Sequence, residues 1–382
     1  MKKILLITTT HTGCGHKSIS DSLMDWFCDM PEVEVVQVDG FEKLVNRFAR
    51  TLCGSYGIVT RHAKFLWAMT WAFGSRFNGF YCNLMTLWAR KRFMRLVQQE
   101  KPDVVITTHP MFNSSLLNVC EREGLRLPFV SVQADPVTIH KSWCDPRSEI
   151  VVCATEEAVK CTLGFGVPRE KIRLVGFPTR RRFTDIAQST DKPPYDPSRP
   201  ARCLMMSGGE GSGKLGRYAL AILKNTDVHL TIVCGRNKQL KLRLETLLKP
   251  HYGDRIDIKG FVNDMENVML ESDILIARGS PNTFFEGIVM NVPLIITGAL
   301  PGQEQGNPDL VAHNNLGIVC ETIHGLPDAV KYLLKDNGQK LQQIRSAQQA
   351  YRRFDNARRI AEIARAVALG TETGSPPEIS AK

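Results

Sequence analysis

The sequence predicts an α/β protein built from two Rossmann-like, doubly wound domains that face each other across a cleft. Short runs rich in β-branched residues alternate with helical patterns, and this alternation occurs once in each half of the chain. A proline-rich stretch separates the halves. With 382 residues and 43% hydrophobic content, the chain is long enough for two cores, since domains typically span about 100 to 200 residues.

Ten strands are expected, five in each half, because each candidate run is apolar, short and followed by turn residues or a helical pattern. In the first half they are 4–8, 33–38, 104–108, 129–132 and 150–154. In the second half they are 203–206, 230–233, 256–259, 274–277 and 294–297. Crossover helices between parallel strands have one hand, so each set predicts a doubly wound sheet.

The predicted domain order follows from these runs and from the position of the prolines. Four prolines between 190 and 200 predict an extended, fairly stiff linker. We expect an N-terminal domain over 1–178 with an insert at 41–96, the linker over 179–200, a C-terminal domain over 201–337, C-terminal helices over 338–368 and a flexible tail over 369–382.

The cysteines and the N-terminus indicate a cytoplasmic protein. The eleven cysteines form no C-x-x-C pair, and several lie in strand-like runs such as 151–154, as expected for reduced thiols in a core. The first apolar run is only four residues long and a glycine turn follows it, so we predict a strand and not a signal peptide. No run approaches the roughly 20 apolar residues that span a membrane.

Positive charge is concentrated in the insert. The whole chain has a net charge of +10, and 41–96 contains ten Lys or Arg against one acid, Glu42. The same segment holds twelve aromatic residues, among them Trp88. Interleaved cations and rings suit a helical element that lies on an anionic membrane surface.

Two other interpretations of the insert stay open. Nucleic acid is bound by similar chemistry, and a helical hairpin with a solvated basic face needs no partner. The apolar bulk of the segment favours the membrane, so we predict peripheral membrane association and no nucleic acid partner. The membrane residues proposed from this segment are Trp67, Trp71, Arg90, Lys91 and Arg92.

Glycine-rich turns follow the first strand of each predicted sheet. They read Thr12-Gly-Cys-Gly-His16 and Ser207-Gly-Gly-Glu-Gly-Ser-Gly-Lys214. Neither is a P-loop, because Leu215 stands where that motif needs Ser or Thr, and neither is a full G-x-G-x-x-G. Glycine also serves tight turns in α/β proteins, but two such turns on facing domains indicate a ligand site.

Polar residues at two consecutive strand ends, between 278 and 307, describe a nucleotide-sugar site. Ser280-Pro-Asn-Thr283 opens a helix whose free N–H groups suit a phosphate. Glu286, one turn further on, suits ribose hydroxyls, and Gln303 with Glu304 offers an amide and a carboxylate for a second polyol. Phosphate, ribose and sugar together indicate a nucleotide sugar.

At these residues the sequence resembles the monogalactosyldiacylglycerol synthases and the related processive diacylglycerol glucosyltransferases of glycosyltransferase family 28. The resemblance covers about 3–317. Its motifs are Gly13-Cys-Gly-His-Lys-Ser18, Thr107-Thr-His-Pro110, Ala134-Asp-Pro-Val-Thr-Ile-His140 with Trp143, the turn at 207–213, Val233-Cys-Gly-Arg-Asn-Lys238, Lys259-Gly-Phe-Val262, Pro281 to Glu286, and Pro301-Gly-Gln-Glu304. In one departure, plant-like members read Gly-Pro-Gly-Thr where this chain reads Ser280-Pro-Asn-Thr283.

The resemblance implies a GT-B fold and inverting transfer of a hexose from a UDP-sugar to diacylglycerol or a related lipid. A UDP-sugar carries its own leaving group, so neither a cofactor nor a metal ion is implied. One alternative keeps this chemistry and uses a polyprenyl-linked or soluble acceptor. Another is a noncatalytic protein that binds a nucleotide sugar or a lipid; the replaced glycines support it, and the retention of His16 and Glu304 argues against it.

The resemblance also implies which residues act on the acceptor. The catalytic residues are His16, the general base, whose ordinary pKa lies near 6.5, and Asp135, which orients a histidine or contacts the acceptor. His109 and His140 are rivals of His16. Gly15 and Trp143 complete the acceptor side.

On the donor side, backbone amides at 209–212 and 280–283 are implied to hold the diphosphate, with charge from Arg236 or Arg278. Phe261 and Val262 are implied to flank the uracil. The full donor set is Gly209, Glu210, Gly211, Ser212, Arg236, Phe261, Val262, Ser280, Pro281, Asn282, Thr283, Glu286, Gln303 and Glu304.

Overall fold

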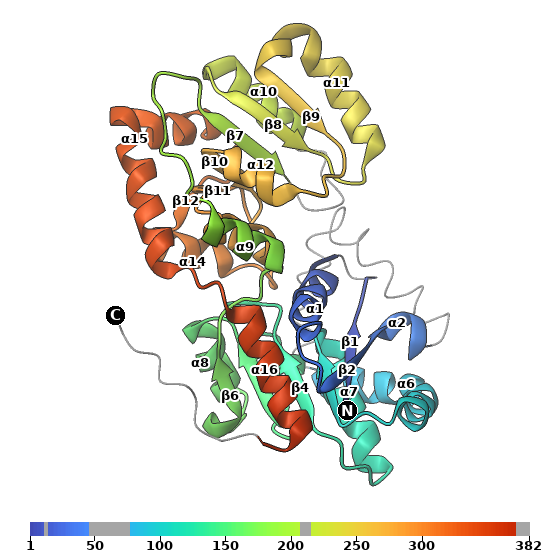
Figure 1. Cartoon of the computed structure of the whole chain (residues 1–382). Helices are drawn as coiled ribbons and strands as arrows, with labels where there is room; N and C mark the ends of the chain where they lie inside the picture. The colour runs from blue at the N-terminus through green and yellow to red at the C-terminus, as the bar shows by residue number, and fades with distance from the viewer. Residues whose placement is uncertain (11–13, 46–76, 207–214, 372–382) are drawn as a thin grey trace. The chain divides into compact units, whose positions relative to one another are not determined.

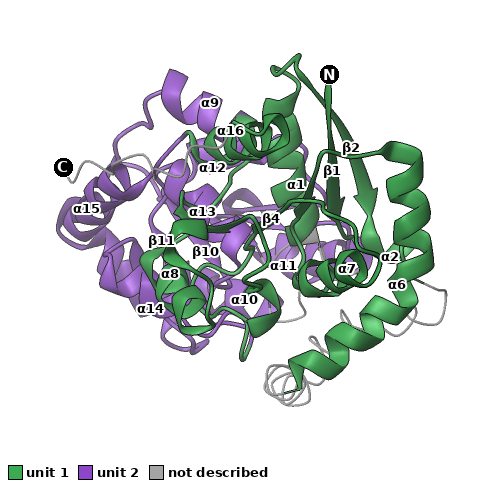
Figure 2. Ribbon diagram, turned by 90° about the horizontal axis from the view of Figure 1, so that it is seen from below, with its two compact units in different colours: residues 1–181, 301–303, 355–382 green, residues 182–300, 304–354 purple. Residues whose placement is uncertain are grey.

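The computed structural model describes residues 1–10, 14–45, 77–206 and 215–371 (Figure 1). Two parallel six-stranded sheets form its framework. Each belongs to one of two compact units, which Figure 2 colours separately. No helix in the described ranges is long and apolar enough to cross a membrane.

The sheet of unit 1 has the strand order β2-β1-β3-β4-β5-β6. Its strands are β1 (Lys2–Thr8), β2 (Val33–Asp39), β3 (Val104–Thr107), β4 (Phe129–Val132), β5 (Ile150–Cys153) and β6 (Ile172–Leu174). Every residue of β3, β4 and β5 is buried. These strands are apolar throughout because the inner strands of a parallel sheet have helices on both faces.

Helices α1 (Cys14–Phe27) and α16 (Asn356–Leu369) pack against each other and against β1. On the apolar core around Phe93, Phe112 and Phe129 lie α6 (Asn78–Glu100) and α7 (Pro110–Arg122). The shorter elements are α2 (Gly40–Lys43), η1 (Lys141–Trp143), α8 (Glu156–Gly164) and η2 (Arg169–Lys171).

The sheet of unit 2 has the order β12-β11-β10-β7-β8-β9. Its strands are β7 (Arg202–Met206), β8 (His229–Val233), β9 (Ile256–Lys259), β10 (Ile274–Ala277), β11 (Leu294–Ile296) and β12 (Gly317–Val319). Its helices are α10 (Leu215–Asn225), α11 (Lys238–Tyr252), η3 (Gly253–Arg255), α12 (Met265–Glu271), α13 (Pro281–Val289), α14 (Asn307–His313) and α15 (Leu326–Tyr351), which is kinked at 335–338.

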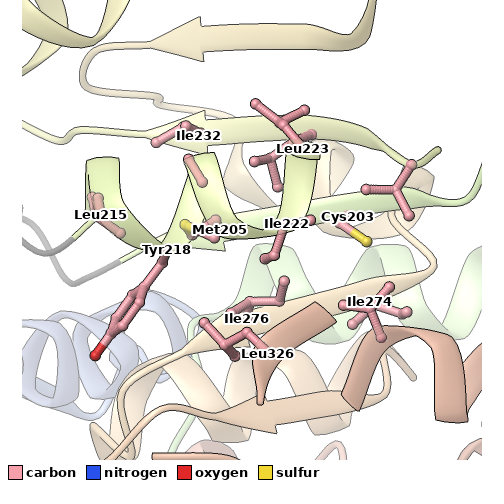
Figure 3. Close-up of a cluster of buried hydrophobic side chains, with 14 of the residues drawn as sticks. Cys203, Met205, Leu215, Tyr218, Ile222, Leu223, Ile232, Ile274, Ile276 and Leu326 are labelled. Carbon is pink, nitrogen blue, oxygen red and sulfur yellow. The ribbon is translucent and has the colours of Figure 1, made fainter. Parts of the chain in front are cut away.

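The core of unit 2 lies between helices and the inner strands. Figure 3 shows Ile222 of α10 close to the strand residues Met205 and Ile276, with Leu326 of α15 nearby. Because these side chains are fully or almost fully buried, they hold β7 and β10 together at the middle of the sheet. This core supports the strands from which the loops of unit 2 extend.

All ten predicted strands are present, with ends that differ by at most one or two residues. Two further strands, β6 and β12, were missed. Each is only three residues long and lies at the edge of its sheet. Such short runs lack a periodic pattern that would distinguish them from loops.

The two compact units are discontinuous in sequence. Unit 1 comprises 1–181, 301–303 and 355–382, whereas unit 2 comprises 182–300 and 304–354. The segment 179–200, for which we expected a linker, begins with α9 (Arg181–Ser189), and 182–200 are part of unit 2. Of the C-terminal helices expected over 338–368, only α16 belongs to unit 1.

Candidate functional site

Three of the predicted site residues, His16, His109 and Arg278, follow strands at which the strand order of a sheet reverses. In unit 1 this reversal falls between β1 and β3, and the two strands are followed by His16 and His109. In unit 2 it falls between β7 and β10, and Arg278 follows β10. Open parallel sheets bind their ligands at these reversals, at the carboxyl ends of the strands.

His16, in the first turn of α1, has a defined tautomer. Its Nδ1 lies 2.6 Å from the backbone carbonyl oxygen of Thr108. A carbonyl only accepts, so Nδ1 must carry the proton and Nε2 has a free lone pair. His16 also packs against His109 at 4.6 Å and against Trp143 at 6.2 Å, measured between ring centroids. We call His16, Thr108, His109, Asp135 and Trp143 the histidine cluster.

Burial keeps His16 uncharged. Only 7% of the residue is exposed. Loss of hydration lowers the pKa of His16 to about 4, although the hydrogen bond to the Thr108 carbonyl acts in the opposite direction. Burial also lowers the pKa of His109 well below its ordinary value, and a charge on His16 would lower it further. The ordinary pKa near 6.5 expected from the sequence is therefore wrong for His16 in this fold, and the imidazole is neutral at physiological pH.

The two rival histidines cap helices. His109 Nδ1 accepts from the backbone N–H of Met111 at the start of α7, at 3.3 Å. His140 Nδ1 accepts from the backbone N–H of Ser142 at the start of η1, at 3.2 Å. In both rings Nδ1 is thus the acceptor and Nε2 carries the proton. Of the three histidines, His16 is the one whose Nε2 is unprotonated.

Asp135 is buried and holds two side chains. Its Oδ2 accepts from the indole N–H of Trp143 at 2.8 Å, and its Oδ1 accepts from the amide of Gln303 at 2.9 Å. Gln303 belongs to the short segment 301–303 of unit 1. Through Trp143, Asp135 fixes the ring that packs beside His16.

In unit 2, hydrogen bonds join the loop after β10 to the loop after β11. Arg278 Nη2 donates to Glu304 Oε1 at 2.9 Å, and the backbone N–H of Leu300 donates to Glu304 Oε2 at 2.8 Å. Asn307 donates through Nδ2 to the carbonyl of Gly279 at 2.8 Å, and the N–H of Gly279 donates to the carbonyl of Gly298 at 2.9 Å. We call 278–280, 298–300 and 304–307 the donor loops.

The N-terminus of α13 has no side-chain cap among the described residues. Ser280 is its N-cap residue, but the Ser280 side chain makes no capping hydrogen bond. Pro281 occupies the first turn, which needs no N–H donor from it. The backbone amides that follow are those that a phosphate would accept from.

The residues that replace family glycines are compatible with this backbone. Ser280 has φ −76° and ψ 126°, an extended conformation open to any residue. Asn282 lies inside α13, and it is not among the residues with positive φ. The local conformation therefore does not require glycine at either position.

Two further predicted donor residues follow neighbouring strands. Arg236 follows β8, and its guanidinium lies 4.7 Å from the ring centroid of Phe261, which follows β9. The Phe261 residue is 54% exposed. An exposed ring beside a cation, with Val262 next in the chain, offers a flat surface for a base. Glu286 is half-buried in the second turn of α13.

Other predicted residues divide between described and undescribed segments. Gly209, Glu210, Gly211, Ser212, Trp67 and Trp71 lie outside the described residues. Gly15 lies in the first turn of α1. On α6, Lys91 and Arg92 are exposed, and Arg90 pairs with Glu123. Within the described ranges, no three His, Cys, Asp or Glu side chains are grouped so that they could hold a metal ion.

Sequence reasoning missed two contributors. The carbonyl of Thr108 sets the His16 tautomer, and Asn307 ties the donor loops together. A backbone carbonyl leaves no trace in a sequence. Asn307 carried a weak signal, since it lies three residues after Glu304 and directly precedes a proline in the first turn of a helix.

Two family models match consecutive parts of the chain. The model for monogalactosyldiacylglycerol (MGDG) synthase matches residues 16–179, and the glycosyltransferase family 28 C-terminal domain matches residues 207–360. Together they span most of the chain. The fold and the two matches define a GT-B glycosyltransferase of family 28. Within that class, the first half of the chain is similar to the MGDG synthases.

Curated relatives agree with this assignment. MGDG synthase 3 of Arabidopsis thaliana is 26% identical over 360 residues, which cover 90% of this chain and 76% of the relative. MGDG synthase 2 of the same plant is 26% identical over 333 residues, which cover 83% and 70%.

Solved structures confirm the fold. MurG of Acinetobacter baumannii has a TM-score of 0.64 at 15% identity, with 96% of this chain and 99% of that chain covered. MnaA of S. aureus, solved with UDP, also has a TM-score of 0.64, at 16% identity and 99% coverage of both chains. A UDP-N-acetylglucosamine 2-epimerase has a TM-score of 0.61 at 12% identity. Because transferases and an epimerase share this fold, the fold alone does not decide the reaction.

Proposed function

We propose that the protein is an inverting glycosyltransferase that moves a hexose from a UDP-sugar to diacylglycerol or a related lipid. One observation carries the catalytic assignment: His16 lies at the reversal of strand order in unit 1 with Nε2 unprotonated. A neutral imidazole nitrogen at this position is suited to remove the proton of an acceptor hydroxyl.

The proposed reaction has one displacement step. The acceptor oxygen bonds to the anomeric carbon on the face opposite UDP, the bond from that carbon to UDP breaks, and the configuration inverts. The hydroxyl proton passes to His16 Nε2. Because burial makes His16 a weak base, the proton moves only as the hydroxyl oxygen gains positive charge from the new bond.

The leaving diphosphate requires electrostatic stabilisation. The amides at the start of α13 and the guanidinium of Arg278 supply it in the proposed site. Glu286 would bind the ribose hydroxyls, and Gln303 with Glu304 the hydroxyls of the hexose. Arg236, Phe261 and Val262 would contact the uracil.

The outer face of α6 supports association with an anionic membrane. Phe80 is 68% exposed and Leu87 is 63% exposed, and both lie in the N-terminal half of the helix. Lys91 and Arg92 are exposed in the half that follows. Since Phe80, Leu87 and Lys91 are spaced by seven and four residues, they share one face. Apolar side chains would enter the lipid and the cations would bind headgroup phosphates.

The activity is tested with purified protein, mixed vesicles that contain diacylglycerol, and UDP-glucose, UDP-galactose or UDP-N-acetylglucosamine in turn. We expect a glycolipid, identified by mass and sugar analysis, with one donor preferred. Release of UDP without a lipid product would indicate a soluble acceptor. If the protein binds no donor, the noncatalytic alternative holds.

The membrane surface is tested by sedimentation with anionic vesicles. We expect Phe80→Ser with Leu87→Ser, and separately Lys91→Ala with Arg92→Ala, to reduce the bound fraction several-fold. The matched control is Leu242→Ser with Lys249→Ala on α11, where Leu242 is 66% exposed. Equal loss in the control, or unchanged binding in the α6 variants, would exclude this face.

A further inference from the structure

We propose that Arg278 couples recognition of the hexose to recognition of the diphosphate. In this proposal one N–H of its guanidinium holds the Glu304 carboxylate toward the sugar, and the remaining N–H groups bind the phosphates. The inference rests on the proposed function, since it concerns the same donor. Arg278 would then both position Glu304 for the hexose and bind the diphosphate.

Glu304 depends on Arg278 for its position. The residue is only 5% exposed, and its two carboxylate oxygens accept from Arg278 Nη2 and from the backbone N–H of Leu300. A buried carboxylate is costly unless it is paired and hydrogen-bonded. Without Arg278, Glu304 would lose the cation of this pair, which offsets the cost of burying its charge.

Arg278 has donors left over for a second anion. Its side chain is 44% exposed, and its pairing with Glu304 uses Nη2. A guanidinium carries five N–H groups in a planar fork. Nε and Nη1 of Arg278 have no hydrogen-bond or ion-pair partner among the described residues. Ser280, two residues further along the chain, is the N-cap of α13, so Arg278 is close in sequence to the amides proposed for the diphosphate.

The donor loops do not rely on Arg278 alone. The hydrogen bonds from Asn307 to Gly279 and from Gly279 to Gly298 do not involve the Arg278 side chain. Asn307 is fully buried, so this connection is protected from water. A substitution at Arg278 should therefore remove its two contacts and leave the loops folded.

The experiment compares Kd values, measured by titration calorimetry on the full chain, for uridine, UDP and the three UDP-hexoses. Arg278→Gln should weaken UDP by about tenfold or more and uridine by less than about twofold, because a charged hydrogen bond to phosphate is lost. Glu304→Gln should leave UDP within about twofold. Both variants should bring the Kd values of the three UDP-hexoses closer together. In the double variant Arg278→Gln with Glu304→Gln, the difference in Kd among the three UDP-hexoses should be as large as in Arg278→Gln alone.

Two controls separate this role from a structural one. Arg278→Lys keeps the positive charge but lacks the planar fork of N–H groups. We therefore expect it to keep part of the affinity for UDP and to lose most of the difference in Kd among the three UDP-hexoses. Asn307→Ala loosens the donor loops without touching Arg278. If Asn307→Ala reproduces both losses of Arg278→Gln, loop order explains them and the proposal is wrong.

Other outcomes also decide the proposal. It is overturned if Arg278→Gln leaves UDP affinity unchanged, if uridine weakens as much as UDP, or if sugar discrimination survives. A wild-type protein that discriminates donors but makes no glycolipid contradicts the proposed acceptor and leaves the role of Arg278 intact. If the wild-type protein binds no uridine nucleotide, both proposals fail.

Discussion

At the scale of single residues, the environment of His16 decides its chemistry. The type of side chain suggested a base of ordinary pKa, but burial lowers that pKa and the Thr108 carbonyl selects the tautomer. The sequence predicted which residue is at the strand end. It did not predict the lowered pKa of His16 or which ring nitrogen carries the proton, because the burial and the Thr108 carbonyl depend on residues distant in the chain.

Replacement of His16 should abolish most of the transfer. Asn at this position can donate to the Thr108 carbonyl as Nδ1 does, but it has no basic nitrogen. We expect kcat for glycolipid formation from His16→Asn to fall by about 10² to 10⁴, with the thermal midpoint little changed. The control is His251→Asn at the end of α11. Near-wild-type kcat in His16→Asn would assign the base elsewhere, with His109 and His140 the next to be tested.

The wild-type pH profile provides a second check on His16. Because its pKa is lowered to about 4, the neutral form dominates at every pH above about 5. We expect kcat/KM to stay level from pH 8 to about 5.5, where a histidine of ordinary pKa would already be mostly protonated. A fall in kcat/KM that is centred near pH 6.5 would show that His16 keeps its ordinary pKa or is not the base.

At the scale of elements, a half-buried lysine contacts a helix end and a glycine with positive φ lies between a strand and a helix. Lys192 Nζ donates to the carbonyls of Met269 and Leu270 in the last turn of α12, at 2.9 and 2.8 Å. A cation at the C-terminus of a helix is favourable. Burial nevertheless lowers the pKa of Lys192 to about 7, and the nearby charge of Arg345 lowers it further.

This shift predicts how stability depends on pH. Between about pH 7 and 10.5 the unfolded chain binds more protons at Lys192 than the folded chain does, so the free energy of unfolding should rise with pH in that window. Lys192→Met cannot titrate, and its urea midpoint should rise less between pH 7 and 9.5. Parallel changes in both proteins would show that Lys192 is not responsible.

Gly176, between β6 and α9, is predicted to be intolerant of a side chain. Its φ is 115°, and a Cβ atom would lie 2.4 Å from Nδ2 of Asn356, which donates to the Phe177 carbonyl. Gly176→Ala should lower the free energy of unfolding by roughly 2 to 4 kcal/mol, the sum of strain and clash. Gly166, with φ 89° and open space around it, isolates the strain. Equal losses in Gly166→Ala and Gly176→Ala would show that the clash is relieved without cost.

At the scale of the whole molecule, the chain ends in the unit in which it begins. Helix α16 buries Ile360, Ala361 and Ala364 and contacts α1, β1 and β3. We expect a chain truncated after Phe354 to lose much of its soluble expression, because a face of unit 1 would be exposed. A chain that ends at Thr371 keeps α16 and is the control. A truncated protein with an unchanged thermal midpoint would contradict this role of α16.

Much of the molecule followed from the sequence alone. A short apolar run such as Val104–Thr107 is typical of a buried strand. Glycine-rich turns followed by polar residues indicate where such strands end. The edge strands β6 and β12 could not be predicted, because three residues pair there only when a neighbouring strand is already in place.

By itself, the sequence determined the two doubly wound sheets, the positions of His16, Asp135 and Glu304 after strands, and the glycosyltransferases that the chain resembles. Only the tertiary structure decided that His16 is neutral with Nε2 unprotonated, that Asp135 holds Trp143 and Gln303, and that Arg278 pairs with Glu304. The physical reason is the separation along the chain over which each kind of interaction acts. Strand and turn preferences act between neighbours in the chain, whereas burial and hydrogen-bond partners are set by residues that only folding brings together.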